Sequence, residues 1–135
     1  MNRSAIPSLV LALALCASAT TAQATEWMYC GDQEGTVELG FLLGSVDAFM
    51  PSGAIMRHDT QHWTTSEAYG EGAIMTVGQG FSDKEVLIVD LYDEAVSAAI
   101  AELRIWKSEE GDMTVAAGTL RIPGHGAWAV ACDAT

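Results

Sequence analysis

The stretch that decides the fold runs from Glu85 to Cys132 and reads EVLIVDLYDEAVSAAIAELRIWKSEEGDMTVAAGTLRIPGHGAWAVAC. It is rich in β-branched residues, and apolar residues alternate with polar ones over much of its length, which is the period of a strand with one buried face. The pattern predicts a meander of four antiparallel strands at 85–92, 99–107, 113–122 and 127–132. Residues 94–100 contain three alanines and also allow one or two helical turns.

The turn at 109–112 predicts how the second and third of these strands pair. Gly111 can adopt a positive φ at little cost, so the turn suits a hairpin. If the four residues form the loop, Ala101 lies opposite Leu120 and Leu103 opposite Gly118.

The first half of the chain predicts shorter strands. Candidates lie at 27–30, 36–43, 54–57 and 73–77, and turn residues separate them. The polar segment His58–Gly72 has the composition of a loop. Seven or eight short strands without a confident long helix predict an all-β domain, either an antiparallel β-sandwich or a small barrel.

The N-terminal 24 residues have the pattern of a secretory signal peptide. Arg3 gives a positive start, residues 9–14 form a short apolar core, and Ala24 ends an A-x-A cleavage pattern. The predicted organisation is therefore a cleaved leader, 1–24, and one β domain, 25–135. In a second interpretation, the lipobox-like sequence before Cys16 makes this cysteine a lipidation site, although Leu15 fits poorly where a small residue is usual.

Removal of the leader leaves two cysteines, Cys30 and Cys132. In an exported chain such a pair predicts a disulfide. The bond would join the first strand to the last, and we expect these strands to be neighbours. Trp27 and Trp128 flank the two cysteines, and each is expected to enter the core.

The chain is strongly acidic, with 18 Asp and Glu against 6 Lys and Arg and a net charge of −12. This balance disfavours nucleic acids and anionic membrane surfaces as partners. It is compatible with a basic exported protein as a partner, with cations, or with solubility alone.

Two histidines and a methionine form a candidate metal site. His58 and His62 are four residues apart, and Met56 lies close to them in the sequence. Imidazole with thioether sulfur would suit copper, and imidazole also suits zinc. The alternative is a pair of solvent-exposed loop histidines, and no bound cofactor is predicted.

An acidic turn is a second candidate for a metal ion. Asp90, Asp93 and Glu94 lie where a predicted strand ends, but their spacing is not that of an EF-hand loop. The alternative is a solvated acidic turn.

Catalytic motifs are absent from the sequence. There is no G-x-S-x-G motif and no glycine-rich phosphate loop, and both cysteines that follow the leader are assigned to the disulfide. The sequence therefore predicts no catalytic residues and favours a non-enzymatic protein.

Three aromatic residues are candidates for partner contact. Trp63 and Tyr69 lie in the predicted polar loop, and Trp106 lies on the polar face of its strand. A large aromatic side chain in such a place is either covered by the loop or serves as a contact anchor.

A few positions near the start of the chain resemble the membrane-bound and periplasmic inhibitors of C-type lysozyme. These positions are Tyr29 with Cys30, the segment 52–54 (Ser-Gly-Ala) and Trp63. The resemblance implies a small secreted antiparallel barrel with a strongly basic target. The arginine-tyrosine that follows Ser-Gly-Ala in that family is Ile55-Met56 here, and the meander after Glu85 has no counterpart.

The combined expectation is a periplasmic or secreted, non-enzymatic binding or accessory protein with an acidic surface. A copper- or zinc-binding protein and a lysozyme-inhibitor-like protein are the alternatives.

Overall fold

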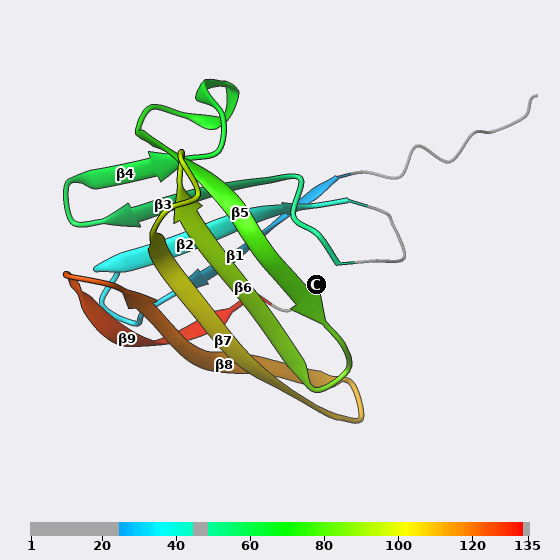
Figure 1. Ribbon diagram of the computed structural model, residues 1–135. Coiled ribbons are helices and arrows are strands. Elements are labelled where there is room, and N and C mark those ends of the chain that lie inside the picture. The colour runs from blue at the N-terminus through cyan, green and yellow to red at the C-terminus, as the bar shows by residue number, and fades with distance from the viewer. Residues whose placement is uncertain (1–24, 45–48, 134–135) are drawn as a thin grey trace, which may run out of the picture.

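The computed structural model describes residues 25–44 and 49–133, and these form a closed nine-stranded β-barrel (Figure 1). The predicted signal peptide and Cys16 lie outside the described residues. The strands are β1 (Glu26–Gly31), β2 (Val37–Leu43), β3 (Gly53–His58), β4 (Gln61–Thr64), β5 (Ala73–Ser82), β6 (Val86–Asp93), β7 (Ala99–Glu110), β8 (Met113–Ile122) and β9 (Gly126–Cys132). The predicted all-β class, the four-strand meander and the disulfide are confirmed, and the architecture is the barrel.

The strands follow one another around the barrel in sequence order, and β1 closes it by pairing with β9. All neighbours are antiparallel except β4 and β5, which pair in parallel. A parallel pair needs a connection that returns along the strand. Here the connection carries the short 3₁₀ helix η1 (Glu67–Tyr69), which lies over the outer surface of β3.

The core fills the barrel with one side chain from every second position. Along β2, for example, Val37, Leu39 and Phe41 are completely buried, as the period of a strand requires. The other strands contribute in the same way, and the completely buried residues are Cys30, Val37, Leu39, Phe41, Ala54, Val89, Leu91, Ala101, Leu103 and Leu120.

The predicted disulfide joins the two strands that close the barrel. Cys30 and Cys132 are directly opposite each other in the β1–β9 pair and are 102 residues apart in sequence. A bond across so long a loop removes conformational entropy from the unfolded chain, which the chain-entropy model values at about 4–5 kcal/mol. The bond therefore holds the closure of the barrel.

The prediction for the two flanking tryptophans is half right. Trp128 is four residues before Cys132, so it shares its inward face and packs against the core. Trp27 is three residues before Cys30, which places it on the opposite, outer face, and there it stacks on Tyr29.

The prediction of one loop over His58–Gly72 is wrong. Residues Gln61–Thr64 form β4, which pairs with β3 through a two-residue turn at Asp59 and Thr60. Asp59 has a positive φ of 51°, which aspartate tolerates better than most residues. Only the part from Thr65 to Gly72 is a connection without strand structure.

The predicted register of the β7–β8 hairpin is also wrong, by two residues. Leu103 lies opposite Leu120 and Ile105 opposite Gly118, because only Gly111 and Asp112 form the turn. A shift by two keeps every side chain on its predicted face. The helical alternative for 94–100 is not observed, since a turn there leads directly into β7.

Candidate binding groove on the outer face of β2 to β4

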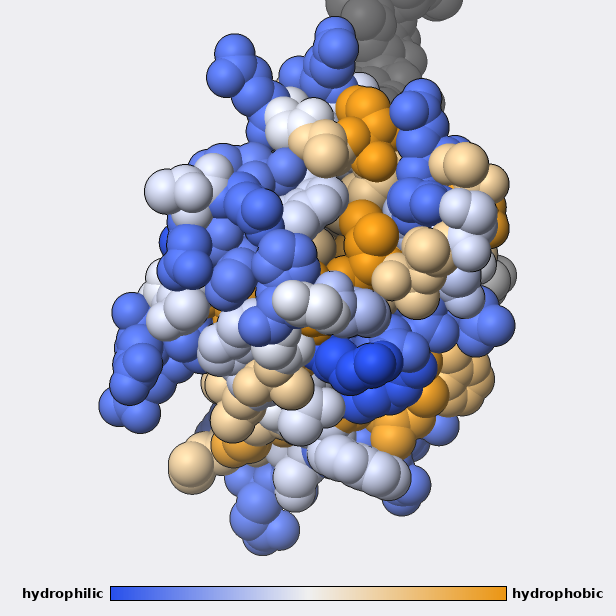
Figure 2. All heavy atoms as spheres, turned by 60° about the vertical axis from the view of Figure 1, so that its left-hand side comes forward, coloured by the Kyte–Doolittle hydropathy of each residue, from blue (hydrophilic) through white to orange (hydrophobic). Residues whose placement is uncertain are grey.

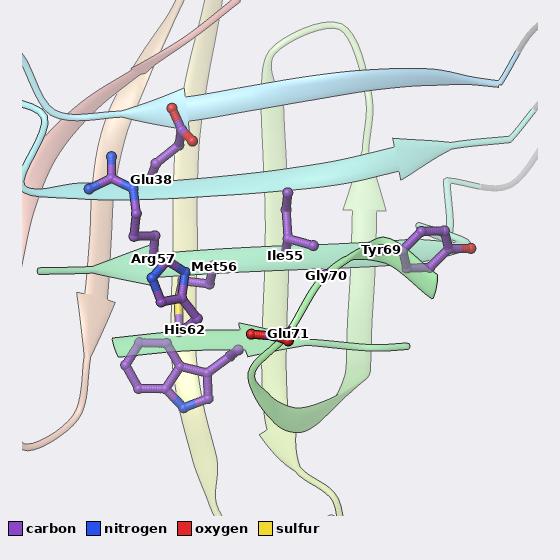
Figure 3. Close-up of a pocket in the computed structure, with 9 residues that line it drawn as sticks. Glu38, Ile55, Met56, Arg57, His62, Tyr69, Gly70 and Glu71 are labelled. Atoms are coloured by element: carbon purple, nitrogen blue, oxygen red, sulfur yellow. The ribbon is translucent and has the colours of Figure 1, made fainter. Parts of the chain in front are cut away.

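A groove of about 390 Å³ lies on the outer face of β2, β3 and β4, beside the connection that carries η1 (Figure 3). We call it the β2–β4 groove. Its lining residues are the outward-facing Glu38, Ile55, Arg57 and His62, the inward-facing pair Met56 and Trp63 at its edge, and Tyr69, Gly70 and Glu71 of the connection. This side of the barrel comes forward in Figure 2, where apolar side chains reach the surface between hydrophilic ones.

One end of the β2–β4 groove is a row of three ionisable side chains. Glu38, Arg57 and His62 are direct cross-strand partners on β2, β3 and β4, so their side chains share the outer face (Figure 3). The Arg57 guanidinium donates a hydrogen bond through Nη1 to the Gly35 carbonyl oxygen at 3.1 Å. Among the described residues Glu38 forms no ion pair, and its carboxylate is open to solvent.

Gly40, Ile55 and Thr64 form the neighbouring row of cross-strand partners, and Ile55 gives the groove an apolar floor. Thr64 is only 1% exposed, and its hydroxyl donates a hydrogen bond to the Ser66 carbonyl oxygen at 2.7 Å. The backbone N–H of Thr65 donates to the Ala54 carbonyl at 2.9 Å. These bonds hold the start of the connection against β3 and so position η1 beside the groove.

The Tyr69 ring forms the wall at the other end, and Trp27 and Tyr29 lie behind it. Tyr69 of η1 meets Trp27 of β1 edge to face at 5.4 Å between ring centres, and Trp27 stacks on Tyr29 at 6.1 Å. Each tyrosine lies over a glycine: a Cβ on Gly53 would be 2.5 Å from the Tyr69 ring, and a Cβ on Gly40 would be 2.6 Å from the Tyr29 ring. Glycine at these two positions is therefore what allows the rings to lie flat on the sheet.

A second hollow, of about 570 Å³, continues the β2–β4 groove toward the barrel closure. The two share Glu38 and Ile55, and the second adds Asp32 and Asp133. The backbone N–H of Val37 donates a hydrogen bond to Asp32 at 2.9 Å, and this bond holds the pKa of the Asp32 carboxyl below its ordinary value. Asp32 is consequently ionised at neutral pH.

The two hollows together carry an excess of negative charge beside apolar surface. Glu38, Glu71, Asp32 and Asp133 face one arginine and one histidine. Carboxylates next to aromatic rings and an isoleucine can bind a cationic group and pack its aliphatic or aromatic part at the same time.

The structure places the three predicted contact aromatics in two regions. Trp63 and Tyr69 both line the β2–β4 groove, and Trp63 also packs against the core. Trp106 lies on β7 and is 69% exposed, so no loop covers it.

The structure separates the residues of the predicted metal site. Met56 and His58 point into the barrel, because their partners on β2 are the buried Leu39 and Val37. His62 is on the outer face in the row with Arg57. Among the described residues no group of three or more His, Cys, Asp or Glu side chains is placed to hold a metal ion.

The acidic turn at the end of β6 uses its carboxylates within the protein. Asp90 accepts a hydrogen bond from Arg104 at 2.7 Å. Asp93 accepts bonds from the Ser97 hydroxyl and backbone N–H, both at 2.6 Å, and these bonds lower its pKa below the ordinary value. Asp93 therefore caps the turn and Asp90 forms a cross-strand ion pair, so these two carboxylates already have partners within the protein.

Several residues of the groove were missed in the sequence. Glu38 and Arg57 lie on adjacent strands, and only the register brings them into one row with His62. The four residues Gln61 to Thr64 contain a single apolar residue, Trp63, so the sequence carries no clear alternation that would have predicted β4.

Comparison of the chain with protein-family models, with curated proteins and with solved structures gives no match. Within the part of the chain that the structure describes, no helix is long and apolar enough to cross a membrane.

Proposed function

We propose that the protein is an exported, non-enzymatic binding protein, and that the β2–β4 groove binds a cationic segment of a basic exported protein. The observation that carries the proposal is the Glu38 carboxylate, which is open to solvent. It lies in the row of ionisable side chains, and the groove beside this row has an apolar floor and an aromatic wall. A buried ion pair would have used this charge internally, whereas here it faces the groove.

The leader pattern of residues 1–24 supports export, and so does the disulfide between Cys30 and Cys132, because such bonds persist in oxidising compartments. The acidic composition of the chain supports a basic partner, since opposite charge speeds encounter and disfavours wrong partners.

A lysozyme-inhibitor-like function is the second candidate, and one observation favours it. Some of the positions that carry the resemblance lie at or beside this groove: Trp63 lines it, Gly53 lies under its Tyr69, and Tyr29 lines the second hollow that continues it. A C-type lysozyme is therefore a suitable basic probe.

Calorimetric titration with decalysine and with a C-type lysozyme tests the proposal. The groove variant carries Glu38→Gln and Glu71→Gln, and the matched control carries Glu109→Gln and Glu110→Gln at the far end of β7, so both lose two charges. We expect the groove variant to bind decalysine about tenfold more weakly, because the lost binding free energy is close to that of two exposed ion pairs. The affinity of the control should change little.

Equal weakening in both variants would show that only net charge matters and would overturn the proposal. Inhibition of lysozyme-catalysed lysis by the wild type, lost in the groove variant, would favour the second candidate. Binding without inhibition would favour another basic partner.

A further inference from the structure

A second group of chemically active side chains lies at one mouth of the barrel, next to the β2–β4 groove, with which it shares Trp63. It consists of His58 at the end of β3, Trp63 on β4, His125 in the β8–β9 turn and Trp128 on β9. The His58 and His125 ring centres are 5.4 Å apart, and their planes are nearly perpendicular at 73°. His58 also lies 4.8 Å from Trp128, and His125 lies 5.9 Å from Trp63.

We infer that this mouth is a binding site for copper(I), with His58 and His125 as its nitrogen ligands and the two indoles as its walls. Two imidazoles that share one metal at about 2.0 Å per bond place their ring centres roughly 6 Å apart. The observed 5.4 Å is close to this value. His125 is exposed in a turn and can adjust its position more easily than a residue within a strand.

The number of donors selects the ion. Zinc in proteins takes four ligands, whereas copper(I) is satisfied by two or three. Among the described residues no third His, Cys, Asp or Glu joins this pair. Met56 points into the barrel two residues before His58, and its thioether is a soft donor of the kind that favours copper(I).

The surroundings favour a cation. Asp59 Oδ2 is 3.5 Å from Nε2 of His58, so a negative charge lies beside one of the two imidazoles. The Trp128 ring centre lies 4.8 Å from that of His58 and the Trp63 ring centre 5.9 Å from that of His125, so an indole borders each of the two imidazoles.

The inference does not rest on the proposed function, because its two ligands, His58 and His125, do not line the β2–β4 groove. It also differs from the arrangement expected in the sequence, since His125 replaces His62. His62 is the third histidine of the chain and lies on the outer face, so it serves as the matched control.

The test is an anaerobic titration of the disulfide-intact protein with copper(I), kept reduced by ascorbate and buffered by the chelator bicinchoninate. We expect one equivalent to bind and to quench tryptophan emission, because Trp63 and Trp128 adjoin the ligands. His125→Ala should weaken binding by more than the roughly 10–100-fold that loss of an outer-shell partner costs, and His62→Ala should leave it unchanged.

His125 is exposed, so its variant should keep the wild-type circular dichroism spectrum and melting temperature. Absence of binding to the wild type would overturn the inference. An equal loss in His125→Ala and His62→Ala would also overturn it, as would tight zinc binding without copper(I) binding.

Discussion

The outer faces of the two halves of the barrel use charged rows in opposite ways. On the meander, Asp90, Glu102 and Arg121 form a cross-strand row across β6, β7 and β8, and ion pairs join Arg121 to Glu102 and Arg104 to Asp90. On the first half, Glu38, Arg57 and His62 form the equivalent row, and among the described residues no ion pair joins them.

The strands and connections around these two rows also differ between the two halves. The meander is built of long, regular hairpins, whereas the first half has short strands, a parallel step at β4–β5 and a connection that overhangs the sheet. The comparison teaches that the charged row of the meander is paired internally, while the row on the first half leaves the Glu38 carboxylate unpaired beside a hollow. A surface of the second kind is the one that can bind a charged partner.

The disulfide should have the largest effect, because it is the covalent bond that holds the two halves together at the closure. Replacing both cysteines, Cys30→Ser with Cys132→Ser, avoids a free thiol and should lower the free energy of unfolding by about 2–5 kcal/mol. Urea denaturation of the variant and of the reduced wild type checks this. An unchanged denaturation midpoint would mean that strand pairing alone closes the barrel.

Two glycine variants, one in each half, should affect different properties: one should lower stability and the other should weaken decalysine binding. A Cβ on Gly118 would lie 1.9 Å from the Arg104 carbonyl oxygen, which belongs to the backbone of β7 and has little room to move. Gly118→Ala should therefore cost about 1–3 kcal/mol of stability by thermal or urea unfolding and leave decalysine binding intact.

Gly53→Ala should do the reverse. The Cβ would meet the outer part of the Tyr69 ring, which can rotate away, so stability should fall less than in Gly118→Ala while decalysine binding weakens. If Gly53→Ala binds as the wild type does, Tyr69 is not part of the binding surface.

Double-mutant cycles compare the two charged rows directly. The Glu102–Arg121 pair is partly exposed, so its coupling energy should be about 0.2–1 kcal/mol, as for other surface pairs. The same cycle on Glu38 and Arg57 should give a coupling energy near zero. A larger coupling between Glu38 and Arg57 would show that the row in the groove is paired after all.

Acid should destabilise the protein by a small amount through three aspartates with lowered pKa values. Asp32 accepts a backbone bond from Val37, Asp83 accepts from Val86 and Glu85, and Asp93 accepts from Ser97. Because the folded carboxyls bind protons less readily than the unfolded ones, their contribution is present at neutral pH and is lost as the pH falls through the lowered pKa values.

Melting temperatures measured from neutral to acidic pH check this expectation. Asp93→Asn should give a shallower fall in acid than the wild type does. An identical slope would assign the acid sensitivity to other groups.

The sequence predicted the elements whose signal is local. The alternation along β2 and along the meander predicted the all-β class. The positions of Cys30 and Cys132 predicted that the first and last strands are neighbours. The parity of spacing could have placed Trp27 outside, because a residue three positions from an inward cysteine faces outward.

The remaining features depend on contacts that no local pattern encodes. β4 has four residues and contains one histidine and one tryptophan, so its polar face resembles a loop. The parallel pairing of β4 with β5 and the meeting of His58 with His125 arise only when the barrel closes. The barrel mouth is a product of this closure, whereas the groove depends on the register of β2 to β4 and on the connection that follows β4.

The most direct test of the central claim is an amide ¹H–¹⁵N NMR titration of the disulfide-intact protein with decalysine, with decaglutamate as the control peptide. The account predicts saturable shifts on β1 to β4 and on the connection from Thr65 to Gly72, and few on the Glu109–Asp112 turn, which is equally acidic. Shifts that follow acidic residues over the whole surface, or that concentrate on the meander, would contradict it.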